Sequence, residues 1–293
     1  MHEPTIARQV NAERIVLFGW SRAILLQLAH PLVAAGVAEH SSFRSGGTSS
    51  IVRLHHTIRA MLALTFGDEA GREAALNGIR AIHTRVHGVL RTTTGIYPAG
   101  TRYSAEDPNL VLWVHATLLE SIPLVYSRLI RELTDRERDA YCADAASIAI
   151  ELGARPGDVP RTWTQTLTYL EGMYFSGAIC VGDEARQLAA AVLSPPLALL
   201  VAPAYANKLM TVGLLPQPLR VQYGFEWNSR LDRRLTRLVG VVRVLRTLLP
   251  RRLAHTDEQE HCDRRQRDAE RGDHHDDEPA AERVRLHASS PSM

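Results

Sequence analysis

The chain has 293 residues, of which 45% are hydrophobic and 23% charged, and its formal net charge is +2. This is the composition of an ordinary globular protein, long enough for one large core. Because the basic residues are spread along the chain and not gathered in one stripe, we expect no nucleic-acid partner.

Apolar residues recur at helical spacing in almost every periodic segment, and strand-like alternation is nearly absent. The sequence therefore predicts an all-α fold, a single compact multi-helix domain over residues 1–253. Pro31 should end the first helix, since a proline disfavours helical geometry in its predecessor. Thr134 and Glu137 have the spacing of a capping box, so a helix should begin there. The expected helices span residues 8–29, 32–40, 48–66, 69–92, 107–131, 134–151, 160–176, 183–194, 197–213 and 229–248.

A charge-free stretch runs from Leu188 to Asn207, nominally long enough to cross a bilayer core of ~30 Å. Pro195, Pro196 and Pro203 remove backbone donors and break a helix, which is costly in lipid. The stretch is therefore interpreted as a buried helix-turn-helix, with peripheral membrane contact as the alternative.

The character of the chain changes from about Thr256, where charged runs leave almost no apolar residue to bury. We expect residues 254–293 to form a disordered charged tail. The three cysteines, Cys142, Cys180 and Cys262, are far apart and odd in number, which fits a reducing compartment. The first residues lack the pattern of a secretory signal, so we expect a cytoplasmic protein.

Histidines cluster on two successive predicted helices, as His55 and His56 on the first and His83 and His87 on the second. His83 lies in an apolar stripe, spaced three and four residues apart, that comprises Leu76, Ile79, His83, Val86 and Leu90. A neutral histidine buried in such a stripe needs a partner, which is either a hydrogen-bonding neighbour or a metal. Spacing leaves both open.

The preceding helix has a face that begins with Arg53, His56 and Thr57 and continues as Ala60 and Leu64. Such a face is polar at one end only, as expected where a core helix reaches into a pocket. A helix N-terminus with hydrogen-bonding side chains would have the same pattern. The motifs of zinc peptidases, serine hydrolases, nucleotide-binding loops and di-iron bundles are absent from the sequence.

Several segments together, from about Val16 to Arg252, resemble the family that joins mpaB-type oxygenases to the catalytic domain of rubber oxygenase, the latex clearing protein. The resemblance depends on their ordered co-occurrence. The segments are Leu28-Ala29-His30-Pro31, Gly36 to Ser41, Arg53 to Thr57, Phe66-Gly67, His83 to Gly88, Tyr103-Ser104-Ala105, Asp107-Pro108 and Trp113 to Thr117.

The resemblance implies an all-helical protein that binds haem b through one proximal histidine and oxidises an apolar, isoprenoid-like substrate with dioxygen. His83 matches the proximal iron ligand. Arg53 and Thr57 match the distal Arg-x-x-Lys-Thr of the rubber oxygenases, where His56 replaces the lysine. Arg53, His56 and Thr57 are thus the implied catalytic residues, Arg53 and His56 also contact the haem, and His83 holds the metal.

Glu39 and His115 are weaker candidates, the first as a pocket acid or base and the second as a pocket-lining or packing residue. Two alternatives to a haem enzyme remain at this point. One is a helical protein that binds lipids or partners without catalysis. The other is a non-haem iron protein whose site comprises His83, His87 and Glu39.

Overall fold

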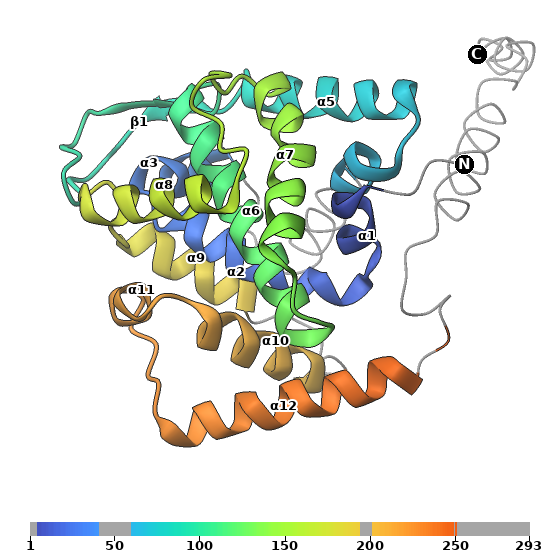
Figure 1. The fold of residues 1–293 in the computed structure, drawn as a ribbon. Helices are drawn as coiled ribbons and strands as arrows, with labels where there is room; N and C mark the ends of the chain where they lie inside the picture. The colour runs from blue at the N-terminus through green and yellow to red at the C-terminus, as the bar shows by residue number, and fades with distance from the viewer. Residues whose placement is uncertain (1–4, 41–59, 194–200, 249, 251–293) are drawn as a thin grey trace, which may run out of the picture.

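Helices make up almost all of the regular structure in the computed structural model of the protein, which confirms the all-α prediction (Figure 1). The structure describes residues 5–40, 60–193, 201–248 and 250. Residues 60–66 are helical. The other elements are α1 (Ile6–Ala12), the 3-10 helix η1 (Arg14–Val16), α2 (Leu17–Leu28), α3 (Pro31–His40), α5 (Glu69–His83), β1 (His87–Val89), β2 (Arg102–Ser104), α6 (Pro108–Leu129), α7 (Asp135–Glu151), α8 (Trp163–Phe175), α9 (Asp183–Leu193), α10 (Val201–Leu214), α11 (Gln217–Gln222) and α12 (Ser229–Leu248).

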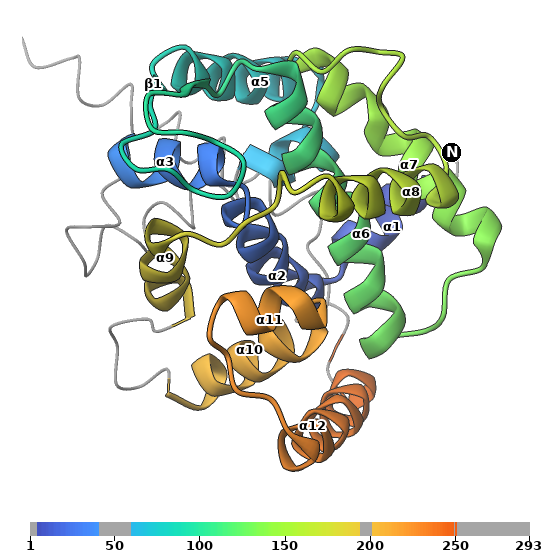
Figure 2. The same ribbon diagram turned by 90° about the vertical axis from the view of Figure 1, so that its left-hand side faces the viewer.

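Helix α6 runs through the middle of the molecule, where it contacts α1, α2, α7, α8 and α12 (Figures 1 and 2). Residues next to each other in the sequence determine where α6 starts. The Asp107 carboxylate accepts a hydrogen bond from the Asn109 amide at 2.8 Å, and Pro108 occupies the first helical position. Gly19 lets α2 lie close to it, since a Cβ there would be 2.9 Å from the Ser121 carbonyl oxygen. These two helices form the framework on which the other elements pack.

In the described part of the chain, α6 is the one unbroken helix long and apolar enough to cross a membrane, and 78% of its most apolar window is buried inside the protein. Such burial is typical of a core helix. The segment Arg14–Leu28 passes the same test only together with α3, to which it is bent by 105°. The charge-free stretch from Leu188 begins in α9, which buries Leu188, Ala189 and Leu193, and ends in α10; residues 194–200 lie outside the described residues.

The helix predicted over residues 8–29 is wrong as one continuous element. Glu13 has an extended backbone, with φ −74° and ψ 111°, and separates α1 from η1 and α2. Its side chain is only 4% exposed and forms an ion pair with Arg246 of α12. This contact between segments distant in sequence is invisible to helical periodicity, and it coincides with the break.

The helix predicted over residues 69–92 is also too long, because α5 ends at His83. The chain then forms β1, which pairs antiparallel with β2 in the register His87 to Ser104, Gly88 to Tyr103 and Val89 to Arg102. Val86 and Leu90 therefore do not continue the α5 stripe, and His83 lies at the end of the helix instead of the middle. Gly88 favours the hairpin, since its missing side chain leaves room for the Tyr103 ring.

We expect Gly88→Ala to lower the free energy of unfolding by about 1–3 kcal/mol, since overpacking forces neighbours to shift. The added Cβ would lie 2.6 Å from the Tyr103 hydroxyl oxygen. Gly78→Ala is the matched control: it lies in α5 with no heavy atom within 4 Å of its Cβ position, and it should stabilise the protein by about 0.5–1 kcal/mol. Urea unfolding of both variants tests this, and equal effects would contradict it.

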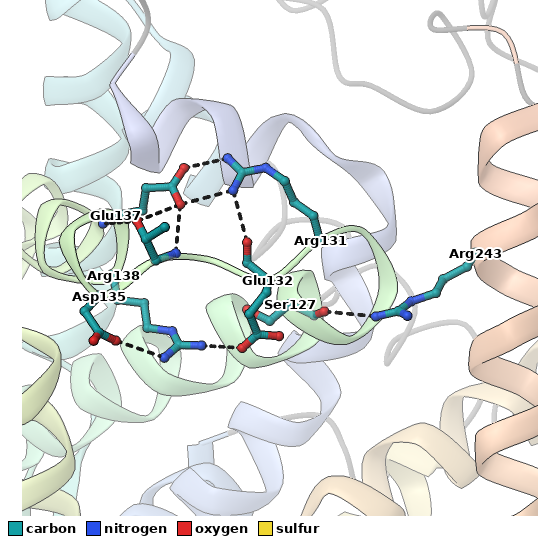
Figure 3. A network of polar contacts seen from close by, with 8 residues as sticks. Ser127, Arg131, Glu132, Asp135, Glu137, Arg138 and Arg243 are labelled. Atoms are coloured by element: carbon teal, nitrogen blue, oxygen red, sulfur yellow. Dashed lines mark hydrogen bonds and ion pairs between the residues drawn. The ribbon is translucent and has the colours of Figure 1, made fainter.

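The predicted start of α7 at the capping box is confirmed. The Thr134 hydroxyl accepts from the Glu137 amide at 3.3 Å, and the Glu137 carboxylate accepts from the Thr134 amide at 2.8 Å (Figure 3). Arg131 bonds the same carboxylate, and this is the largest effect that holds the pKa of Glu137 at about 2. Close by, Arg243 of α12 donates to the Ser127 carbonyl oxygen at 3.3 Å, which ties α12 to the end of α6.

Candidate functional site

A cavity of about 510 Å³ lies between α2, α3, α5, α6, α7 and residues 60–66. Most of its wall consists of aliphatic side chains. The apolar lining includes Ile24, Leu32, Val33, Val37, Met61, Leu62, Ile79, Val114, Leu118, Leu119, Ile122 and Ile148. This size falls in the range of about 300–1,000 Å³ typical of small-molecule and cofactor sites, so the cavity is the candidate functional site.

The His83 side chain lines this cavity from the last residue of α5. Its ring makes no hydrogen bond to any described residue. Burial lowers the pKa of this imidazole below its ordinary value of 6.5, against a smaller opposing effect of the Glu106 carboxylate. The ring is therefore mainly neutral at neutral pH, with a nitrogen lone pair available to a ligand.

A second imidazole, that of His115, lines the cavity from α6. The residue is 8% exposed, and its Nε2 atom is buried without a hydrogen-bond partner in the described structure. Burial alone lowers the pKa of His115 to about 4. An unpaired buried polar atom costs about 1–3 kcal/mol, so this atom is a hydrogen-bonding site for a water molecule or a bound ligand.

His30 provides an internal comparison, because it is equally buried but fully hydrogen-bonded. Its Nδ1 accepts from the Leu32 amide at 3.3 Å, and its Nε2 lies 3.1 Å from the Tyr97 hydroxyl oxygen. Since Nδ1 accepts, the neutral ring carries its proton on Nε2 and donates it to Tyr97. His30 is therefore a structural histidine, whereas His83 and His115 have ring nitrogens left for a ligand.

A polar cluster of Glu39, Arg91 and Tyr103 corrects the expectation for Glu39. Its carboxylate accepts hydrogen bonds from the Tyr103 hydroxyl and from Arg91 Nε, the latter at 2.5 Å. The bond from Tyr103 is the largest effect that lowers the pKa of Glu39, so the group stays ionised. Glu39 does not line the cavity, and each of its carboxylate oxygens already accepts a hydrogen bond, which does not suit a pocket acid or base.

The alternative of a non-haem iron site comprising His83, His87 and Glu39 is wrong. Within the described ranges, no three histidine, cysteine or acidic side chains are grouped closely enough to hold a metal ion. The His87 side chain is exposed, and its Nδ1 lies 3.2 Å from the Thr84 carbonyl oxygen. His87 does not line the cavity.

Arg53, His56 and Thr57 lie outside the described residues, so their predicted roles stay predictions. The described residues on either side of that segment, His40 and Ala60, both line the cavity. The residues that flank the segment on both sides thus lie at the cavity wall.

Sequence reasoning missed the polar edge formed by Asn11, Glu13 and Arg14, which also line the cavity. These residues surround the break between α1 and η1, and an unbroken helix was expected there. The segments on which the family resemblance rests do reach the cavity. Their residues in its wall include Gly36, Val86, Tyr103, Ser104 and His115. His115 is thus confirmed as a lining residue.

The buried histidines predict a loss of stability in acid. The native pKa values of His30 and His115 are both lowered from 6.5 to about 4. The unfolded chain therefore takes up protons first as the pH falls below 6.5, and stability declines until about pH 4. Between about pH 7 and 5 each of these two rings should lower the free energy of unfolding by about 2 kcal/mol. His115→Phe should remove the part of this acid destabilisation that His115 causes, which urea unfolding at pH 7 and pH 5 measures. If the variant loses as much stability in acid as the wild type does, His115 is not one of the causes.

Comparison with known proteins identifies the family of this chain. The chain is 28% identical over 239 residues to an uncharacterised protein of Mycobacterium bovis and, equally, to one of Mycobacterium tuberculosis. Each match covers 78% of this chain and 88% of the relative. No solved structure matches. The model of the catalytic domain of the ER-bound oxygenase mpaB/B' and rubber oxygenase family matches residues 7–244, a span that includes every described cavity residue, and the chain belongs to this family.

Proposed function

We propose that this protein is a haem b-dependent oxygenase that oxidises an apolar, isoprenoid-like small molecule with dioxygen in the cytoplasm. The observation that carries the proposal is a pair of neutral imidazoles in a largely aliphatic cavity, the half-buried His83 and the buried His115, whose rings make no hydrogen bond to a described residue. Membership of an oxygenase catalytic-domain family supports it.

The residues present fit a haem group. A haem needs an axial ligand, and the His83 ring, neutral and accessible from the cavity, suits that role. A porphyrin also needs an apolar enclosure, which the aliphatic side chains of α2, α3 and α6 provide. When bound, the haem would supply the one-electron and dioxygen chemistry that amino-acid side chains lack.

The chain's own residues would hold the reactants and exclude water. The His115 imidazole can donate or accept one hydrogen bond in the cavity, which suits an uncharged polar group of a bound molecule. Arg53, His56 and Thr57 would form the opposite wall, by resemblance to the family motif. The apolar lining would bind a hydrocarbon chain and keep bulk water away from it.

The absorbance spectrum of protein purified from haem-replete cells, recorded beside bulk iron quantification, tests the proposal. We expect a Soret band, a protohaem pyridine haemochrome and equal amounts of iron and porphyrin. Colourless protein carrying a lipid without iron would favour the non-catalytic lipid-binding alternative. Iron without porphyrin would contradict the proposal in a different way, by indicating a non-haem site.

A further inference from the structure

Helix α12 is fixed to the body of the protein by one of its faces. Leu235, Leu238 and Val242 pack against the buried cluster of Val125, Leu129 and Met210. Two arginines strengthen the attachment: Arg243 donates to the Arg128 carbonyl oxygen at 2.8 Å, and Arg246 forms the ion pair with Glu13 at the cavity edge. The opposite side of α12 therefore faces outward in a defined orientation.

A regular stripe follows this outer side, with residues spaced four, three, four, three and four apart, and so on one helical face. We name it the α12 outer stripe: Arg230, Arg234, Arg237, Val241, Val244 and Leu248. Its first half is basic and its second half apolar. Val241, Val244 and Leu248 are 54%, 60% and 74% exposed, and the adjacent Leu245 is 54% exposed. Four large aliphatic side chains thus face solvent side by side.

The charge of α12 is strongly one-sided, with six arginines and one aspartate. Arg230, Arg233 and Arg237 are exposed, and their guanidinium groups form no hydrogen bond or ion pair with a described residue. The single aspartate, Asp232, accepts a bond from the Trp227 indole at 3.3 Å. The surface around the stripe is therefore cationic and lacks its own counter-charges within the described structure.

We propose that the α12 outer stripe docks the protein on an anionic lipid surface, independently of any cofactor. Arginines attract acidic headgroups, and exposed valines and leucines insert among the upper acyl carbons; the two act together at a membrane interface. Arg246 of the same helix forms an ion pair with Glu13, which lines the apolar cavity. In the docked protein, α12 would therefore lie between the lipid and this edge of the cavity.

Two other occupants fit this surface poorly. In a parallel pair of α12 helices from two copies, the arginines of one stripe would face those of the other, and in an antiparallel pair they would face valine and leucine. Residues 251–293 of this chain carry charges of both signs but few apolar residues to cover the aliphatic half. A lipid surface alone matches both halves.

Flotation of the full-length protein with vesicles tests the proposal. We expect binding to phosphatidylcholine vesicles that contain phosphatidylserine, little binding to phosphatidylcholine alone, and a loss of binding as salt is raised. Arg230→Gln with Arg237→Gln should weaken binding roughly 30-fold, at about fivefold for each charge near the surface. Val244→Ser with Leu248→Ser should weaken it at least roughly tenfold.

Matched controls separate this surface from general charge and hydrophobicity. Arg136→Gln with Arg161→Gln removes two exposed charges elsewhere, and Ile96→Ser with Val221→Ser removes two exposed apolar side chains, 60% and 71% exposed. Both should bind vesicles as the wild type does. The proposal is overturned if the wild type does not float, if controls and stripe variants lose binding equally, or if the stripe variants only convert a dimer to a monomer. Because haem-free protein should also float, failure here leaves the proposed oxygenase function untouched.

Discussion

His83→Ala protein is expected to lose its haem, with apparent affinity lowered on the order of 100-fold or more, because the substitution removes the proposed axial ligand. Its Soret band and its pyridine haemochrome should both disappear. His83→Gly should regain the Soret band when imidazole is added, since the cavity beside α5 would admit the free ring. Absorbance spectra of the purified variants check both results.

Two histidine controls sharpen this experiment. His87→Ala alters an exposed residue that lies outside the cavity, so haem content should stay at the wild-type level. His115→Ala should retain the haem, because that ring is proposed to contact a bound molecule and not the iron. If His115→Ala loses the haem while His83→Ala keeps it, the ligand lies on α6 and the assignment of His83 is wrong.

Arg22→Leu should be the most destabilising single substitution proposed, at about 3–5 kcal/mol, because it leaves a largely buried carboxylate without its partner. The side chains of Arg22 and Glu120 are 3% and 15% exposed and form an ion pair between α2 and α6. Arg22 also donates to Ser121 Oγ at 2.6 Å and to the Leu214 carbonyl oxygen at 2.8 Å, which ties the end of α10 to this pair. Urea unfolding gives the free energy of each variant.

The matched control is Arg155→Leu, which breaks the ion pair with Asp158 at 3.4 Å between side chains that are 58% and 51% exposed. Solvent screens such a pair, so we expect a change below about 1 kcal/mol. The double variant Arg22→Leu with Glu120→Leu should recover most of the lost stability, because no isolated charge remains. Equal costs for Arg22→Leu and Arg155→Leu would contradict this account of the α2–α6 contact.

The sequence predicted those elements whose signals are local. The capping box at Thr134, the Asp107-Pro108 helix start and the boundary at Pro31 are all in the structure as expected. The two errors near the cavity have a common cause. The break at Glu13 coincides with an ion pair to Arg246 and the hairpin after His83 with pairing to Tyr103, and periodicity detects neither contact.

The candidate site was predictable only in part for the same reason. The motif residues did identify the helices that line the cavity, and His83 and His115 both reach it. Sequence spacing could not distinguish a hydrogen-bonded buried histidine from an unpartnered one, since His30, His83 and His115 all lie in apolar surroundings. The distinction depends on Tyr97 and the Leu32 amide, which engage the His30 ring alone.

X-ray diffraction from crystals of the haem-loaded protein, with the anomalous signal of iron, tests the central claim most directly. The account predicts one iron peak inside the cavity between α2, α3, α5 and α6, at coordination distance from the His83 ring, with a porphyrin around it. An iron peak ligated by another residue, or a porphyrin bound outside this cavity, would contradict it.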